Sequence, residues 1–502
     1  MRRKILLAGT AAMLAGSPAA AETLREALAK AYATNPTLSG QRANLRATDE
    51  GVPIAKAAAR PNITLQGAYT ENVVKSANSF VSPDRSGTAQ SSVSYPVFSG
   101  GAVRNSIAAA ETRVEAGRAN LRGTESDLFT AVVGAYMDVI RDEAIVALNT
   151  QNVKVLDVNL QASRDRFQVG DLTRTDVAQS DARLAVARSQ LQSAEARLIS
   201  SRESYIRLVG TAPGVLETPP ELPNLPASPD TAVDVALEQN PDLIAAQKAR
   251  DATAFDVNVA KASRLPKVNV VVGGSYYNYL GTLGGANAAL AQQSGQAAQA
   301  GLQFTMPLYQ GGRPAAEVRQ AQARRSQSIE LLTETERGVI AQTRSAYAIW
   351  RSSLEVIQSS EVAARANRLS LEGVRAENSV GNRTILDILN AEQELLNSQV
   401  TLVTARRDAY VAGFALLAAM GQAEAADLNL DGGALYDPAV NYKRVRGKAW
   451  DFGSDPDPVP VGTSTVQTKP QGSEVTRPLD PTLETPVDRS APITAGDATR
   501  NR

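Results

Sequence analysis

The chain of 502 residues contains neither cysteine nor histidine. These two absences exclude disulfides, thiolate nucleophiles, Cys/His zinc sites, haem histidine ligands and Ser-His-Asp triads. Aromatic residues make up only 5% of the chain, which favours helices packed through Ala, Leu and Val over a globular enzyme core. We therefore expect no catalytic site, no metal site and no cofactor. The balance of 52 Lys+Arg against 52 Asp+Glu gives no reason to expect a nucleic-acid partner.

The N-terminus has the pattern of a secretory signal peptide. Arg2, Arg3 and Lys4 precede an apolar run over 5–15, and small residues follow over 17–21. This order predicts a signal peptide over 1–21, cleaved after Ala21. The alternative is a membrane anchor, but the apolar run falls short of the roughly 20 residues that a spanning helix needs. No second apolar stretch approaches that length, so membrane insertion would have to use β-strands.

The chain contains a tandem duplication. Its turn-forming residues recur at offsets of 205 and then 211: Asn35-Pro36 as Asn240-Pro241, Phe98-Ser99-Gly100-Gly101 as Tyr309-Gln310-Gly311-Gly312, and Val169-Gly170 as Val380-Gly381. The two repeats are expected over 22–212 and 230–436. A proline-rich linker over 213–229 joins them, and a proline-rich tail occupies 437–502.

Each repeat predicts one short helix, one very long helix and one return helix. The expected ranges are 36–60, 101–167 and 173–209 in the first repeat and 241–264, 312–378 and 384–420 in the second. A helix of 67 residues is about 100 Å long at roughly 1.5 Å per residue. Such helices bury little alone and have to pack side by side. Taken alone, they also fit a helical bundle without a conduit.

Between the short and the long helix, each repeat has two segments in which apolar and small polar residues alternate. They lie near 62–74, 87–98, 267–280 and 296–308, and no charged residue occurs from Val268 to Gly312. Period-two alternation over about ten residues is typical of transmembrane strands. The alternative is a pair of soluble hairpins that cap a bundle. Because lipid permits no open sheet edge, four strands per chain would require an oligomer: two copies supply eight strands and three supply twelve.

The order of these elements and the repeated Asn-Pro and Gly-Gly corners resemble the TolC-like outer-membrane efflux proteins. So does the segment from Val380 to Leu389, VGNRTILDIL. The resemblance implies a mainly α protein with transmembrane β-strands: a homotrimer with a 12-strand barrel in the outer membrane and a 12-helix tunnel in the periplasm. It further implies a passive exit duct for drugs or secreted proteins, with a periplasmic adaptor and an inner-membrane pump as partners.

The resemblance also implies two sites. The turns at Val169, Gly170, Val380 and Gly381 match those that contact the adaptor. The periplasmic gate would include Asp387 and Arg383, with Asp176 and Thr175 from the first repeat, and Asn390 stands where many relatives have a second aspartate. A simpler interpretation is that Thr173-x-x-Asp176 and Thr384-x-x-Asp387 are capping boxes of the return helices.

The tail from 437 to 502 holds nine of the 25 prolines and is expected to be largely disordered, at least over 455–502. Arg444, Arg446 and Lys448 with Trp450 suggest docking along the outer wall of the tunnel, whereas a solvated linker is the simpler reading. Two rival functions are also considered: a structural or adaptor protein of helical hairpins, and a periplasmic hydrolase that uses carboxylates.

Overall fold

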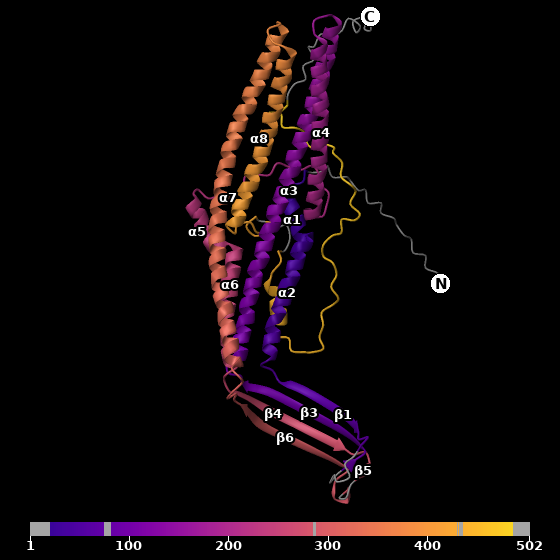
Figure 1. Cartoon of the computed structure of the whole chain (residues 1–502), viewed down its shortest axis with the longest axis vertical. Coiled ribbons are helices and arrows are strands. Elements are labelled where there is room, and N and C mark those ends of the chain that lie inside the picture. Colours follow the sequence, from indigo (N-terminus) through magenta and orange to yellow (C-terminus); the bar gives the residue numbers. More distant parts are fainter. Residues whose placement is uncertain (1–20, 75–81, 285–287, 429, 431–434, 485–502) are drawn as a thin grey trace, which may run out of the picture.

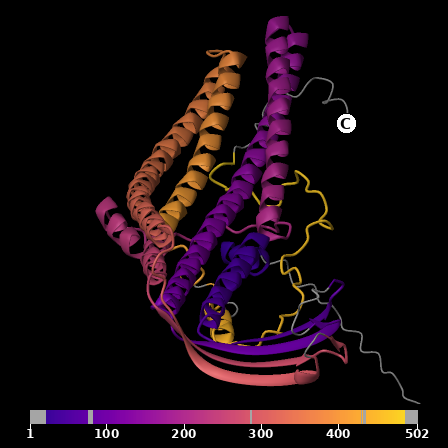
Figure 2. The same ribbon diagram turned by 60° about the horizontal axis from the view of Figure 1, so that its bottom comes forward.

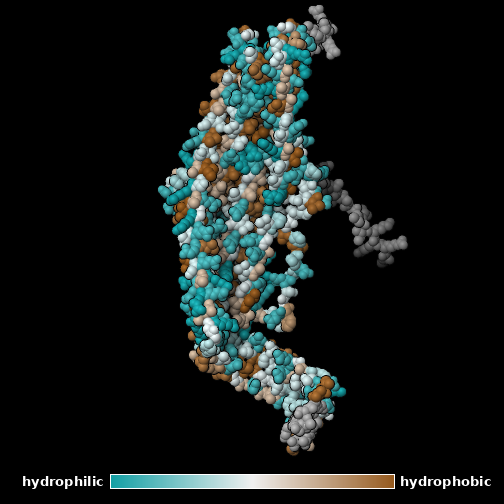
Figure 3. All heavy atoms as spheres, in the orientation of Figure 1, coloured by the Kyte–Doolittle hydropathy of each residue, from teal (hydrophilic) through white to brown (hydrophobic). Residues whose placement is uncertain are grey.

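The computed structural model describes residues 21–74, 82–284, 288–428, 430 and 435–484. The expected signal peptide lies, except for Ala21, outside the described residues. The molecule is elongated, with two helical hairpins reaching one end and a sheet at the other (Figure 1). The space-filling view shows hydrophobic side chains scattered along the helical body among hydrophilic ones (Figure 3).

The helices occur in two matching sets, as the duplication predicts. The bounds in the first half are α1 Leu24–Thr34, α2 Pro36–Ala57, α3 Ala102–Gln168 and α4 Arg174–Val209. Those in the second half are α5 Pro229–Gln239, α6 Pro241–Ala262, α7 Arg313–Ser379 and α8 Ile385–Ala419, followed by α9 Ala439–Val445. The helices α1, α5 and α9 were not foreseen. α3 and α7 each have 67 residues and are the long uninterrupted helices of the two halves.

The strands form an antiparallel sheet in the order β1-β3-β4-β6. Their bounds are β1 Asn62–Glu71, β3 Arg85–Phe98, β4 Lys267–Asn278 and β6 Ser294–Thr305; β2 Ser82–Pro83 pairs with β5 Leu283–Gly284, and a 3₁₀ turn covers Ala288–Leu290. Within the described residues β1 and β6 each pair with one neighbour, so both are edge strands. Apolar side chains such as Leu65, Leu302 and Phe304 are exposed on this sheet, which Figure 2 shows as a curved layer below the helices.

Two asparagines explain the recurring Asn-Pro pairs. The Oδ1 atom of Asn35 accepts hydrogen bonds from the backbone N–H groups of the first turn of α2, and its Nδ2 donates to the Leu208 carbonyl oxygen over 2.9 Å. Asn240 caps α6 in the same way and donates to the Ala419 carbonyl oxygen, also over 2.9 Å. Each asparagine therefore caps one helix and holds the end of the return helix against it.

The main core lies around the middle of α3. Phe129, Tyr136 and Tyr205 are fully buried there, and α1 packs against them. The Tyr136 hydroxyl donates to the Glu22 and Glu217 carbonyl oxygens over 2.8 and 2.6 Å, so the proline-rich linker is fastened at the same level. None of the helices in the described ranges has both the length and the apolar character to cross a membrane.

The tail differs from the sequence expectation over residues 455–484. This segment has no helix or strand, yet its part over 471–483 lies against the long helices and buries Leu483 beside Leu396 and Leu402 of α8. Its backbone carbonyls accept hydrogen bonds from helix side chains, so a proline-rich chain is held without secondary structure of its own. The expectation for 485–502 lies outside the described residues.

Candidate gate and hairpin turns

The turns that close the two hairpins have the same conformation. Gly170 and Gly381 have φ values of +85° and +83°, a region that L side chains avoid, and this explains the glycine at both positions. The preceding valines, Val169 and Val380, are 80% and 70% exposed. Exposed apolar residues at both tips, far from the sheet, are available to a partner (Figure 1).

Each return helix begins with the capping box that the sequence predicts. The carboxylate of Asp387 accepts hydrogen bonds from the Thr384 backbone N–H over 2.9 Å and from its hydroxyl over 2.8 Å. Asp176 has the same two bonds with Thr173, over 2.9 and 2.7 Å. The bond from the Thr384 backbone lowers the pKa of Asp387, and the Thr173 hydroxyl lowers the pKa of Asp176. Both carboxylates are therefore held in their charged form.

The other expected gate residues have different surroundings. The guanidinium of Arg383 forms an ion pair with Glu377 over 2.7 Å, within its own hairpin, and contributes only a longer-range charge effect at Asp387. Both partners are about half exposed. Thr175 is exposed in the first turn of α4. The structure thus shows both capping boxes but brings Arg383 to a glutamate that the sequence analysis did not single out.

Two contacts near the tips join the hairpins to each other. Arg183 of α4 donates to the Asn390 Oδ1 of α8 over 2.7 Å, and Arg166 of α3 donates to Asn378 of α7 over 3.4 Å. The roles of Arg183, Arg166 and Asn378 could not be predicted from the sequence, because each lies in a helix whose facing partner is about 210 positions away. The duplication offset was the only signal that could have paired the two tips.

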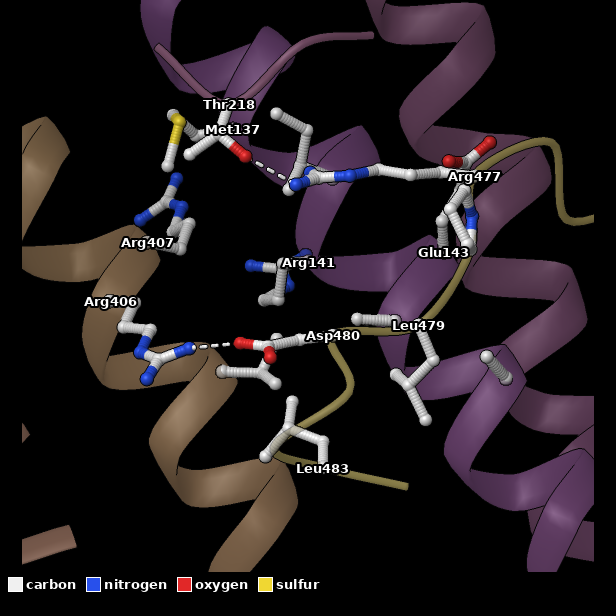
Figure 4. Close-up of a pocket in the computed structure, with 15 residues that line it drawn as sticks. Met137, Arg141, Glu143, Thr218, Arg406, Arg407, Arg477, Leu479, Asp480 and Leu483 are labelled. Carbon is white, nitrogen blue, oxygen red and sulfur yellow. Dashed lines mark hydrogen bonds and ion pairs between the residues drawn. The ribbon is translucent and has the colours of Figure 1, made fainter. Parts of the chain in front are cut away.

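Below the second tip, charged side chains are buried in pairs. Arg375 of α7 donates to Glu392 of α8, and the side chain of that glutamate is only 6% exposed. A pocket at mid-height is lined by Arg141, Arg406 and Arg407 together with tail residues such as Asp480, to which Arg406 donates over 3.0 Å (Figure 4). In the part of the chain that the structure describes, no three acidic residues gather as they would around a metal ion. In these two places the charged side chains pair with one another.

Comparison with known proteins agrees with this architecture. Residues 27–211 and 232–422 match the outer membrane efflux protein family. The chain is 36% identical to the outer membrane efflux protein BepC of Brucella suis over 88% of its own length and 94% of BepC. It is 25% identical to outer membrane protein TolC of Escherichia coli over 83% of its length and 86% of TolC. The CmeC outer membrane channel of Campylobacter jejuni shares the fold, with a TM-score of 0.71 over 84% of this chain and 89% of CmeC at 14% identity. The chain therefore belongs to the outer membrane efflux protein family, the non-enzymatic outer-membrane channels of tripartite efflux and type I secretion systems.

Proposed function

We propose that three copies of this chain form an exit duct that is closed at its hairpin tips until an adaptor and a pump engage it. The observation that carries the proposal is the sheet with two open edges at the end of helices about 100 Å long, at roughly 1.5 Å per residue. Lipid does not tolerate open edges, so the sheet has to be closed by further copies. Three copies supply twelve strands, which leave a lumen, whereas eight are filled by their own side chains.

The tips supply the elements of a gate. The contact between Arg183 and Asn390 joins the two hairpins of one chain, and hairpins that open a tunnel have to part or slide at such contacts. Asp387 lies one turn before Asn390 on α8 and is ionised at neutral pH, so three copies would bring three carboxylates to the axis of the tunnel. Asn390 contributes no charge, and the ring would then attract cations less than one with six aspartates.

The adaptor is proposed to contact the exposed turns at Val169–Gly170 and Val380–Gly381. Both combine an apolar side chain with a fixed glycine conformation. Replacing both valines by Asp should abolish co-purification of the adaptor, whereas the trimer itself should remain, because the tips bury nothing in the chain.

Single-channel recording of the reconstituted protein tests the gate. Arg183→Ala should raise the open probability, whereas Arg188→Ala should not, because Arg188 pairs with Asp157 inside the first hairpin over 3.3 Å. Asp387→Asn removes the charge and should weaken block by divalent cations. The matched variant Asp176→Asn changes the equivalent capping residue of α4. If block is unchanged in Asp387→Asn, the assignment of Asp387 to the constriction is wrong; an equal fall in Asp176→Asn assigns both capping aspartates to it.

The cargo is tested in cells that lack the chain. Sensitivity to antibiotics and dyes reports drug efflux, and loss of a protein from the culture medium reports secretion. Restoration of either by the parent chain supports an exit duct. If cells without the chain lose neither their tolerance of antibiotics and dyes nor a secreted protein, the proposed duct is refuted.

A further inference from the structure

We propose that the tail carries a membrane-docking patch, formed by Trp450, Phe452, Arg446 and Lys448, that binds the phospholipid headgroup layer on the periplasmic side of the outer membrane. This inference rests on the proposed function, because it takes the sheet to be the part that lies in the membrane. The patch belongs to neither the gate nor the tips, and it adds a second contact with the bilayer to that of the strands.

The patch is held in place by α2. The helix α9 precedes it and is anchored by buried Val445 and by Asn441, whose Nδ2 donates to Asp49 over 2.8 Å. Farther along, Arg60 donates to the Lys448 carbonyl oxygen over 2.6 Å and Lys56 to the Arg446 carbonyl oxygen over 3.4 Å. These bonds fix the backbone of the patch, while its four side chains are exposed; the guanidinium of Arg446 lies over the ring of Tyr442, 5.9 Å from its centroid.

Its two aromatic rings have no cover. Trp450 is 77% exposed and Phe452 is 86% exposed, and the two rings meet edge to face at a centroid distance of 5.5 Å. A fixed pair of large exposed rings is unusual in a tail otherwise poor in aromatics, since no aromatic residue follows Phe452. Large exposed apolar groups that are held in place mark a contact surface.

The patch lies at the level where the sheet begins. Arg60, which holds Lys448, is two residues before the first residue of β1, Asn62. Trp450 is two residues beyond Lys448, about 7 Å of extended chain at most. Figure 1 shows the tail after α9 passing the end of α2 that is nearest the sheet. With the sheet in the bilayer, this level is the membrane interface.

The charges around the rings favour phospholipid over a second copy of the chain. Residues 443–455 contain four bases and two acids, and Asp455 is paired with Arg444 over 2.7 Å and with Lys448 over 3.4 Å. Lys443 and Arg446 are exposed and add positive charge to the same segment of chain. Segments that anchor proteins at a membrane interface combine Trp or other aromatic rings with Lys and Arg. Anionic headgroups attract the Lys and Arg side chains.

Tryptophan fluorescence tests the patch, because the chain has only two Trp residues. Trp350→Phe leaves Trp450 as the sole emitter in the full-length trimer. The protein is reconstituted into vesicles of phosphatidylcholine and phosphatidylglycerol, with and without bromine on the acyl chains close to the headgroups. We expect Trp450 to lose emission in the brominated vesicles, and Arg446→Gln with Lys448→Gln to reduce that loss.

Two reporters in the Trp350→Phe/Trp450→Phe background complete the test. Phe304→Trp on the sheet should be quenched if the sheet lies in the bilayer, and Val466→Trp, farther along the tail where the side chain is also exposed, should not. Quenching of the Phe304→Trp reporter without quenching of Trp450 overturns the docking patch and leaves the proposed function intact. Absence of quenching at Trp450 and at the Phe304→Trp reporter refutes both the docking patch and the proposed function. Quenching of Trp450 that equals that of the Val466→Trp reporter also overturns the patch, because it indicates unspecific contact of the whole tail.

Discussion

The buried ion pair between Arg202 of α4 and Glu143 of α3 offers a sharp test of how the tail is held. The two side chains are 7% and 3% exposed and meet at 2.5 Å. Arg202 also donates to the carbonyl oxygens of Gly472 and Glu474 in the tail, both over 2.7 Å, and the Thr476 hydroxyl donates to Glu143 over 2.8 Å. One arginine therefore serves the helix pair and the tail together.

Comparing the single variant Arg202→Met with the double variant Arg202→Met/Glu143→Leu separates the ion pair between the helices from the bonds to the tail. The single variant leaves a buried carboxylate without its cation, which costs about 3–5 kcal/mol of unfolding free energy. The double variant removes that carboxylate and should return to about the stability of the parent or above it. In both variants the tail loses its two bonds from a charged donor, each contributing about 1.5–3 kcal/mol. A loss of about 3 kcal/mol raises the population of released tail roughly 100-fold, at 1.4 kcal/mol per factor of ten.

Two measurements follow these two effects. Denaturation in guanidinium, monitored by circular dichroism of the detergent-solubilised protein, reports the helices. A protease specific for glutamate reports the tail, because cleavage after Glu474 needs the backbone that Arg202 holds. The rate at which the C-terminal fragment is released should rise in the single variant and at least as much in the double variant, which also removes the carboxylate that accepts from the Thr476 hydroxyl.

A specific pattern would refute this account. If the double variant unfolds as easily as Arg202→Met, the stranded carboxylate is not the source of the loss. If cleavage after Glu474 remains at the parental rate in both variants, the bonds to Gly472 and Glu474 do not hold the tail. Val466→Ala serves as the control: its side chain is 83% exposed, and neither measurement should change.

Three further predictions concern other parts of the chain. Thr384→Val removes the hydroxyl that donates to the Asp387 carboxylate and accepts from the Asp387 backbone N–H over 3.3 Å. The bond to the carboxylate helps to lower the pKa of Asp387, so its stabilisation is full above the ordinary value of 3.8 and is lost as the pH falls through the lowered value. The difference in melting temperature from the parent should therefore be larger at pH 7 than in strong acid, where only the lost backbone cap remains. Gly421→Ala should destabilise the protein far more than Gly381→Ala. Both glycines have a positive φ, so alanine costs about 1–2 kcal/mol of backbone strain at either position. A Cβ at position 421 would in addition overlap the Gln239 carbonyl, whereas position 381 faces open space; equal melting temperatures of the two variants would contradict this. Mass spectrometry of the exported protein should find Glu22 as its first residue, as the small residues over 17–21 predict. Cleavage there is compatible with the fold, because the backbone nitrogen of Glu22 donates to the Val215 carbonyl oxygen over 2.7 Å and would still donate as a free ammonium. Retention of residues 1–21 would show that the signal peptide is not removed.

The helices and capping boxes could be predicted because their causes are local. The expected helix over 101–167 and the observed α3 Ala102–Gln168 differ by one residue at each end, since Gly101 and Gly170 mark the limits. Thr384 and Asp387 form their capping box from side chains three positions apart. The short helices α1 and α5 were missed because their 11 residues carry too few periodic positions to stand out from the flanking segments.

The contacts between distant segments could not be predicted in the same way. Nothing local indicates that Asn35 donates to the carbonyl oxygen of Leu208, or that Arg183 finds Asn390. The tail was expected to be disordered because composition counts apolar side chains, whereas its docking uses backbone carbonyls and a single buried leucine, Leu483. Such acceptors are present in every sequence and become informative only when a partner such as Arg202 is seen beside them.

The contacts of Asn35 with Leu208 and of Asn240 with Ala419, here called the asparagine joints, divide the helical body at one level. At the level of Asn35 and Asn240 the return helices end and new helices begin, so among the helices of the described residues only α3 and α7 cross this level without interruption. The joint is therefore the natural fulcrum of each hairpin. α4, with 36 residues, is a lever about 54 Å long, so a rotation of about 5° at its base displaces the tip by about 5 Å, roughly one helical turn. If the tips form the proposed gate, a small bend in α3 and α7 would be enough to move them past one another without a movement of the sheet.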